Sequence, residues 1–304
     1  MKVIDVHTHG IGGYDTRTTD VEHILKIAEI HGSFGVTEIM PTIYPATIKV
    51  MRDSLALVKQ AMNIQSSHPL LRQEFRTEKY GDAENRRPAQ IIGAHVEGPF
   101  LNPLRCGSLN AMTFIDPTEY NLSQLIEGFE GIIKIITLSP ELDGSLQLIR
   151  TISDHGIIAS MGHSDATFSE AEAGHKAGAK GVTHLFNAMR PFHHREPGLA
   201  GYGLLNPDMY VEVIADSYHL HAATIDLVLR AKNPEKIILV SDSIKETKIP
   251  ATPVSTTEGL ADRHGRLLGG SMTITEAADE LAKLHDREII INCISANPAR
   301  YLYS

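Results

Sequence analysis

The sequence predicts an α/β fold, a (β/α)8 barrel, and three observations support it. Short β-branched runs alternate with segments of helical periodicity, which is the pattern of repeated βα units around a parallel sheet. Eight such runs occur, the number that closes this barrel. The chain has 304 residues, 42% of them hydrophobic, enough for the core of one large barrel or of two ordinary domains. The eight runs favour one barrel domain spanning residues 1–304.

The expected elements alternate in chain order. The segment 20–31 has apolar residues at helical spacing, and Gly32 and Gly35 behind it favour a helix end before the second strand. The expected strands are residues 2–6, 36–40, 91–96, 132–137, 157–161, 180–183, 210–215 and 236–241. The expected helices are residues 20–31, 46–64, 123–129, 145–154, 169–177 and 222–231.

Two stretches depart from this alternation. Residues 65–90 are highly charged and are expected to form a solvated helix or an excursion from the barrel. Residues 246–270 are rich in glycine and proline and predict a long loop or a small hairpin after the eighth strand. Loops at that end of a barrel usually help to cover a pocket.

Composition restricts the classes of partner and compartment. A formal charge of −9 disfavours nucleic acid and anionic lipid as partners, and an anionic small substrate would need a local positive group. Cys106 and Cys293 are far apart in sequence, which indicates neither a disulfide framework nor a thiolate metal site and favours a reducing cytoplasm. We expect a soluble protein, because the sequence contains no signal-peptide core and no membrane span.

His7 and His9 stand one residue apart at the end of the first expected strand. Side chains two residues apart on a strand point to the same face, so the two imidazoles could bind one metal ion. Two histidines that merely line a polar loop are the alternative interpretation.

Four further ligand-type side chains also follow expected strands. Because a barrel gathers the carboxyl ends of its strands at one mouth, these residues are expected to meet the His7–His9 pair. Imidazole with carboxylate suits zinc first, then iron or manganese. The four additional candidate ligands are Glu97, His163, His184 and Asp242.

Other residues predict chemistry around such an ion. Asp242 could take a proton from a metal-bound water and return it to a leaving group. His219, just past the seventh strand, suits substrate binding, because the metal already has enough ligands. Arg195 could anchor an anion, although a solvated loop arginine is the alternative.

The chain resembles the N-acetylglucosamine-6-phosphate deacetylases of the amidohydrolase superfamily. The resemblance implies a TIM barrel of the metal-dependent hydrolase type, and its motifs follow in order along nearly the whole chain. The motifs are HTHG (7–10), GVTEIMPT (35–42), HVEGPFLNP (95–103), TLSPE (137–141), GHSDAT (162–167), THLFNAM (183–189), HHREPGLAG (193–201), IADSYH (214–219), SDS (241–243) and LLGGSMT (267–273).

The resemblance also implies roles for single residues. Asp242 would be the general acid and base, and His219 would help to polarise the acetyl carbonyl. Arg195 would reach the phosphate in the neighbouring subunit, which implies a homodimer. The principal metal would be held by Glu97, His163 and His184, and a second position by His7 and His9, with Asp242 beside them. The expected substrate-binding residues are Ser108, Asn187, Ala188, His194, Arg195, His219 and Met272.

Several features depart from the family pattern. Leu109 stands where a ligand-contacting histidine is usual, Ser217 where glycine is usual, and Ser243 where alanine is usual. These changes bear on the exact sugar more than on amide hydrolysis. Members also carry a small accessory β-sandwich, and most or all of it is expected to be missing from this chain.

The expected function is metal-dependent deacetylation of N-acetylglucosamine 6-phosphate to glucosamine 6-phosphate and acetate in amino-sugar catabolism. The cofactor would be one or two divalent ions, with zinc favoured over iron and manganese. Two alternatives stay open at this point. One is another amidohydrolase reaction, on a related sugar such as N-acetylgalactosamine 6-phosphate or on a cyclic amide. The other is a non-catalytic barrel that binds sugar phosphates.

Overall fold

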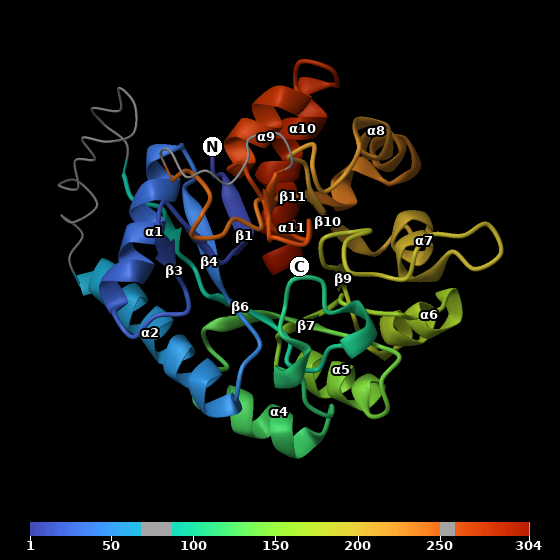
Figure 1. Cartoon of the computed structure of the whole chain (residues 1–304), viewed down its shortest axis with the longest axis horizontal. Helices are drawn as coiled ribbons and strands as arrows, with labels where there is room; N and C mark the ends of the chain where they lie inside the picture. The colour runs from blue at the N-terminus through green and yellow to red at the C-terminus, as the bar shows by residue number, and fades with distance from the viewer. Residues whose placement is uncertain (68–86, 250–258, 304) are drawn as a thin grey trace.

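Eight parallel strands form the centre of the protein, and helices surround them (Figure 1). The structure is a computed structural model and describes residues 1–67, 87–249 and 259–303. All eight predicted strands are present, and the short β5 (Gln90–Ile91) adds to β4. The barrel strands, in spatial order, are β1 (Ile4–Thr8), β4 (Glu38–Ile43), β6 (Ala94–Glu97), β7 (Ile133–Leu138), β8 (Ile158–Met161), β9 (Gly181–Val182), β10 (Tyr210–Ile214) and β11 (Ile237–Val240).

The last strand returns to the first and nearly closes the barrel. The backbone N–H of Asp242, two residues past β11, donates to the carbonyl of His7 over 2.9 Å. Thr8 and Ser243 form an isolated parallel bridge just beyond that contact. The predicted (β/α)8 fold is confirmed, and its seam lies beside three of the predicted site residues.

Helices connect the strands on the outside of the barrel. Two of them, α5 and α8, have the predicted bounds, whereas α4 lies earlier than predicted because Thr118 caps its first turn. The helices are α1 (Val21–Ser33), α2 (Ile48–Ser67), α4 (Glu119–Ile126), α5 (Ser145–Asp154), α6 (Phe168–Ala177), α7 (Gly198–Leu205), α8 (Ala222–Ala231), α9 (Ile274–Leu281), α10 (Arg287–Ile294) and α11 (Ala296–Tyr303). Across the described residues, no helix combines the length and the apolar character that a membrane span requires.

Helix α7 and the three helices after residue 270 were not among the predicted helices. Residues 198–204 of α7 are buried, so the helix lacks the polar face that makes a helical period visible in sequence. Helix α9 does carry a signal, because Thr273 and Glu276 form a capping box around its first turn.

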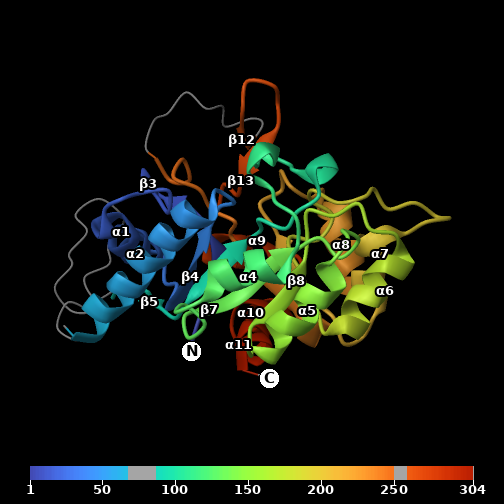
Figure 2. The same ribbon diagram turned by 90° about the horizontal axis from the view of Figure 1, so that it is seen from below.

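Short hairpins lie outside the barrel. β2 (Gly10–Ile11) pairs with β3 (Tyr14–Asp15), and β12 (Leu260–Ala261) pairs with β13 (Leu267–Gly269). The second hairpin stands over the barrel at the end opposite the two termini (Figure 2), which confirms the small hairpin predicted within 246–270. Residues 250–258 of that stretch, and residues 68–86 of the charged stretch 65–90, lie outside the described residues.

The barrel interior is apolar at the end near the termini and polar at the other. Helix α11 lies across the apolar end and packs on β1 and β11. Its fully buried Tyr301 belongs to the same apolar cluster as Ile4, Met40 and Ile238. This cluster forms the floor beneath the polar side chains at the mouth.

Replacing Gly181 with alanine should test this floor. A Cβ at Gly181 would overlap the Tyr301 hydroxyl and lie 2.9 Å from the Ser160 Oγ, where the buried tyrosine cannot move aside. We expect Gly181→Ala to lower the free energy of unfolding by about 1–3 kcal/mol, measured from the denaturant midpoint. Gly131→Ala is the control, because nothing lies within 4 Å of its Cβ position. Equal midpoints for the two variants would contradict this account.

Candidate metal centre

The predicted metal ligands lie together at the mouth of the barrel in two groups of three. In the first group, the Glu97 Oε1 lies 3.2 Å from the His163 Nε2 and 3.1 Å from the His184 Nε2. The two imidazole nitrogens are themselves 3.1 Å apart. These residues come from β6 and from the ends of β8 and β9, as the sequence predicted.

The second group contains His7, His9 and Asp242. The His7 Nε2 lies 3.3 Å from the His9 Nε2 and 3.4 Å from the Asp242 Oδ1, and the His9 Nε2 lies 3.5 Å from the same oxygen. Glu97 links the groups, because its Oε1 lies 3.5 Å from the His7 Nε2 and its Oε2 3.2 Å from the His9 Nε2. The side chains predicted from the two halves of the chain therefore converge.

These spacings fit a metal ion. Bonds of about 2.0–2.1 Å in tetrahedral geometry place neighbouring ligand atoms about 3.3 Å apart. The observed separations of 3.1 to 3.5 Å within the two groups match that edge length.

Hydrogen bonds on the far side of two rings assign their protons. The His163 Nδ1 lies 2.9 Å from the Arg105 carbonyl, and the His9 Nδ1 lies 3.2 Å from the Thr42 carbonyl. A carbonyl only accepts, so each Nδ1 carries the hydrogen and each neutral ring turns an Nε2 lone pair towards Glu97. Lone pairs and a carboxylate repel one another unless a cation lies between them, so the donor set fits a divalent metal.

The charge state of the cluster also calls for a cation. Burial alone would raise the pKa of Glu97, but the imidazoles of His163, His184 and His9 that surround it hold the pKa well below its usual range. Burial lowers the pKa of His184, yet its hydrogen bond to Glu97 and the charge of that carboxylate outweigh this and raise the pKa to about 9. A proton on His184 takes the role of the positive charge that a metal would supply.

The backbone is strained where three of these residues leave their strands. His163, His184 and Asp242 have φ values of 47°, 33° and 45°, in the left-handed region. Such a conformation costs about 1–3 kcal/mol per residue and persists only where the surroundings fix it. At Asp242 the N–H donates to His7 and the carbonyl accepts from Gly270 over 2.7 Å. Non-glycine residues in this conformation concentrate at functional sites.

A cavity of about 350 Å³ opens over the cluster. Gly107, with φ 58°, lies at its wall, and a Cβ there would come within 3.3 Å of the Ala188 Cβ. The predicted substrate-binding residues that line the cavity are Ser108, Asn187, Ala188 and His219. Leu109 and residues 265–269 of the β12–β13 hairpin complete part of the wall.

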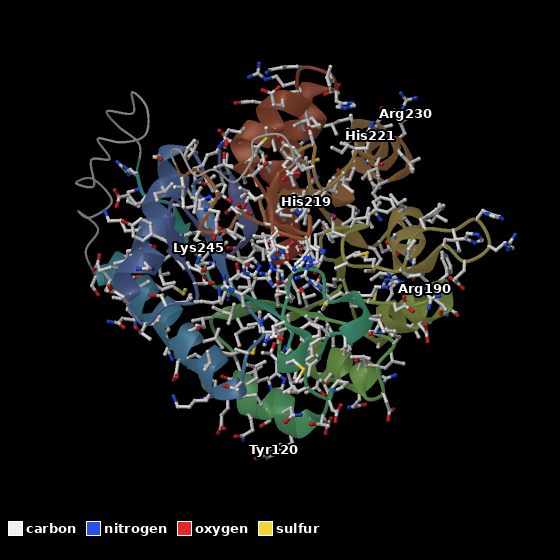
Figure 3. The ribbon with its side chains drawn as sticks, in the orientation of Figure 1. Tyr120, Arg190, His219, His221, Arg230 and Lys245 are labelled. Carbon is white, nitrogen blue, oxygen red and sulfur yellow. The ribbon has the colours of Figure 1, made fainter. Side chains whose placement is uncertain are left out.

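His219 lies near the barrel axis, whereas His221 and Arg230 lie at the periphery (Figure 3). The His219 Nδ1 is 3.0 Å from the Asp216 Oδ2, which also accepts from the Ser271 N–H over 3.0 Å. Burial alone would raise the pKa of Asp216, but its hydrogen bonds from His219 hold the pKa below its usual range. The carboxylate thus occupies Nδ1 and leaves Nε2 as the ring atom available to a ligand. Asp216 was missed as a site residue, although it stands only three residues before His219.

Three predicted substrate-binding residues do not line the cavity of their own chain. Met272 packs against the hydrophobic core. His194 and Arg195 are exposed and contact each other, with 3.1 Å between the His194 Nε2 and the Arg195 Nη1. They belong to the loop between β9 and α7, which extends away from the barrel axis (Figure 1). Among the described residues that line the cavity, Arg266 of the hairpin is the one lysine or arginine.

Two further buried residues contact the cluster without having been predicted. His95 precedes Glu97 by two residues on β6, and Glu212 lies on β10; both are grouped with His7. The signal for His95 was present, because His95 and Glu97 have the same two-residue spacing as His7 and His9.

Comparisons with known proteins find relatives in sequence and in structure. No family model matches the chain. An N-acetylglucosamine-6-phosphate deacetylase from Bacillus subtilis (strain 168) is 36% identical over 244 residues, which cover 80% of this chain and 57% of the relative. The protein of that name from Lysinibacillus sphaericus is 30% identical over 310 residues, covering 98% of this chain and 75% of the relative. The chain thus spans little more than half the length of the Bacillus relative.

A solved structure shows the same fold. The crystal structure of N-acetyl-D-glucosamine-6-phosphate deacetylase from Mycobacterium smegmatis superimposes with a TM-score of 0.84 at 25% identity. The match covers 99% of this chain and 78% of that chain.

Replacing Glu97 with glutamine should remove metal from both groups, because its two oxygens contact histidines of each group. We expect at least about tenfold weaker binding of the divalent ion, measured as metal content by mass spectrometry after dialysis. His163→Ala should affect the first group alone. Glu170→Gln, in the capping box of α6, is the control and should keep the wild-type metal content. Full metal content in Glu97→Gln would refute the shared role of this carboxylate.

Proposed function

Because the chain belongs to the N-acetylglucosamine-6-phosphate deacetylase family, we propose that it hydrolyses N-acetylglucosamine 6-phosphate to glucosamine 6-phosphate and acetate in amino-sugar catabolism. The observation that carries this proposal is the convergence of six ligand-type side chains from both halves of the chain below one cavity, with Asp242 and His219 facing it. A cytoplasmic location fits the two free cysteines.

The metal would be zinc, with iron or manganese as alternatives, because the donors are imidazole nitrogens and carboxylate oxygens. Glu97, His163 and His184 would hold the principal ion, and His7 and His9 a second. When bound, a divalent cation supplies a Lewis acid that polarises the amide carbonyl and makes water acidic enough to attack at neutral pH.

Asp242 would move the proton of the reaction. Its carboxylate accepts a proton as the water oxygen attacks the acetyl carbon, and it returns the proton to the sugar nitrogen as the C–N bond breaks. His219 would polarise the acetyl oxygen from its Nε2, while Asp216 holds its Nδ1. Negative charge that develops on this oxygen would be stabilised by a donor already held in place.

The phosphate needs cations in a protein whose formal charge is −9. We propose that Arg266, which lines the cavity, supplies one from the same chain. Its Nε and Nη2 are held by Asp262 at 2.9 and 2.8 Å, and among the described residues Nη1 has no hydrogen bond. We further propose a homodimer in which Arg195 of the partner subunit supplies the second, since its loop extends away from its own barrel.

Acetate release from N-acetylglucosamine 6-phosphate is the direct test of the proposed function. We expect the metal-loaded protein to release acetate and the chelated protein to lose this activity. Asp242→Asn should keep the ion at Glu97, His163 and His184 but lower kcat by about 10²–10⁴-fold, because the amide cannot shuttle the proton. No acetate from this substrate, alongside release from its galactosamine epimer or from a cyclic amide, would reassign the substrate. Absence of turnover on all of them would favour a binding protein.

Phosphate recognition should depend on the two arginines. We expect Arg266→Ala and Arg195→Ala each to raise KM for the phosphorylated substrate at least about tenfold, because each variant loses a hydrogen bond to a charged group. The KM for unphosphorylated N-acetylglucosamine should change little.

Arg263→Ala, on the same hairpin but outside the cavity lining, is the matched control for Arg266. A mixture of Arg195→Ala and Asp242→Asn chains tests the partner role, because half of the dimers would contain one complete site. About one quarter of the wild-type activity should return on mixing. No recovery on mixing, or an unchanged KM for Arg266→Ala, would refute the corresponding assignment.

A further inference from the structure

Beneath the metal groups, the barrel holds a second set of ionisable side chains. His7 on β1, His95 on β6 and Glu212 on β10 are each fully buried, with ligand atoms close enough to share an ion. Their hydrogen bonds decide whether this set is another metal site or serves a different purpose.

His95 is not available to a metal. Its Nδ1 lies 3.0 Å from the Val6 carbonyl and must carry the hydrogen, because a carbonyl only accepts. Its Nε2 lies 2.7 Å from the Thr137 hydroxyl, which therefore donates to it. Both nitrogens of His95 are engaged, so the three residues do not form a further cation site.

His7 has a different role, because its two nitrogens face opposite ways. The Nε2 faces Glu97 and Asp242 in the metal groups, at 3.5 and 3.4 Å. The Nδ1 faces the Glu212 Oε2 at 3.3 Å, and both side chains are shielded from solvent. A metal-binding imidazole almost always donates its other N–H to an acceptor that fixes the tautomer and the ring orientation.

The partner of His7 differs from those of the other ligand histidines. His9 and His163 donate to neutral backbone carbonyls, and the His184 Nδ1 has no partner among the described residues. His7 alone among these four histidines has a carboxylate behind it. A carboxylate increases the basicity of the ring, so the Nε2 of His7 becomes the stronger ligand.

We infer that Glu212 is a positioning residue that holds His7 in the tautomer and orientation required to bind metal. The backbone of Glu212 is fixed on both sides. Strand β10 pairs in register with β11, and the backbone carbonyl of Glu212 accepts a hydrogen bond from the Leu185 N–H over 2.8 Å. The other carboxylate oxygen, Oε1, is buried and has no hydrogen-bond partner among the described residues. A buried carboxylate with one unpaired oxygen destabilises a barrel interior, which favours a role in the site over a role in packing. The inference depends on the metal binding in the proposed function.

The experiment measures metal affinity without substrate. Zn²⁺ affinity and stoichiometry are determined by competition with a chromophoric chelator for the wild type, Glu212→Leu and Glu212→Gln. We expect Glu212→Leu to lower the affinity for the Zn²⁺ ion that contacts His7 by about 10–100-fold. The affinity for the ion held by Glu97, His163 and His184 should not change. Glu212→Gln should recover part of the affinity, because an amide oxygen still accepts from Nδ1.

Thr137→Val is the matched control, because it removes a hydrogen bond from the same buried layer at His95 instead of His7. It should lower the thermal midpoint but keep wild-type Zn²⁺ affinity. Wild-type affinity in Glu212→Leu, or equal losses in Glu212→Leu and Thr137→Val, would overturn the role of Glu212 alone. A wild-type protein that binds no Zn²⁺ would overturn the metal assignment and this inference with it.

Discussion

The site depends on one carboxylate. Glu97 contacts imidazole nitrogens of four histidines, at 3.1 to 3.5 Å, and these histidines come from β1, β8 and β9 or from the residues directly after them. Such an arrangement requires the barrel to close, because His7 and His184 lie far apart in sequence. The hydrogen bond from the Asp242 N–H to the His7 carbonyl joins the first and last strands at the same height. The barrel therefore closes at the place where the candidate metal ligands meet.

Much of the fold could be predicted because β-branched runs reveal buried parallel strands directly. Helix α7 was not predicted because it is buried, so its sequence lacks the alternation of polar and apolar residues at helical spacing. The convergence of the candidate ligands could be predicted because chemistry at a barrel gathers at strand ends, and each candidate stands at such an end. Glu212 could not be assigned a role, because nothing in a sequence shows that a glutamate on β10 lies behind a histidine on β1. Met272 shows the converse, since a motif match places a residue near a site without directing its side chain.

The polar end of the barrel is kept at the expense of stability. Three site residues hold left-handed backbone, and the His184 Nδ1 and Glu212 Oε1 are buried without partners among the described residues. Burial raises the pKa of Glu212 to about 7, and likewise that of Asp5. Packing of the apolar floor around Tyr301 and of the helices outside the strands offsets the cost of the strained backbone and of the buried polar atoms. The apolar floor of the barrel thus contributes to its stability, whereas the charged mouth carries the candidate site.

The β12–β13 hairpin is joined to the rest of the site at its base. The N–H of Gly270 donates to the Asp242 carbonyl, and the next residue, Ser271, donates to the Asp216 carboxylate that holds His219. The two proposed proton-handling groups therefore share one mechanical support, which also carries Arg266 over the cavity. A shift of this base would alter the alignment of both groups at once, so the proposed phosphate contact of Arg266 and the positions of Asp242 and His219 depend on the same segment of backbone.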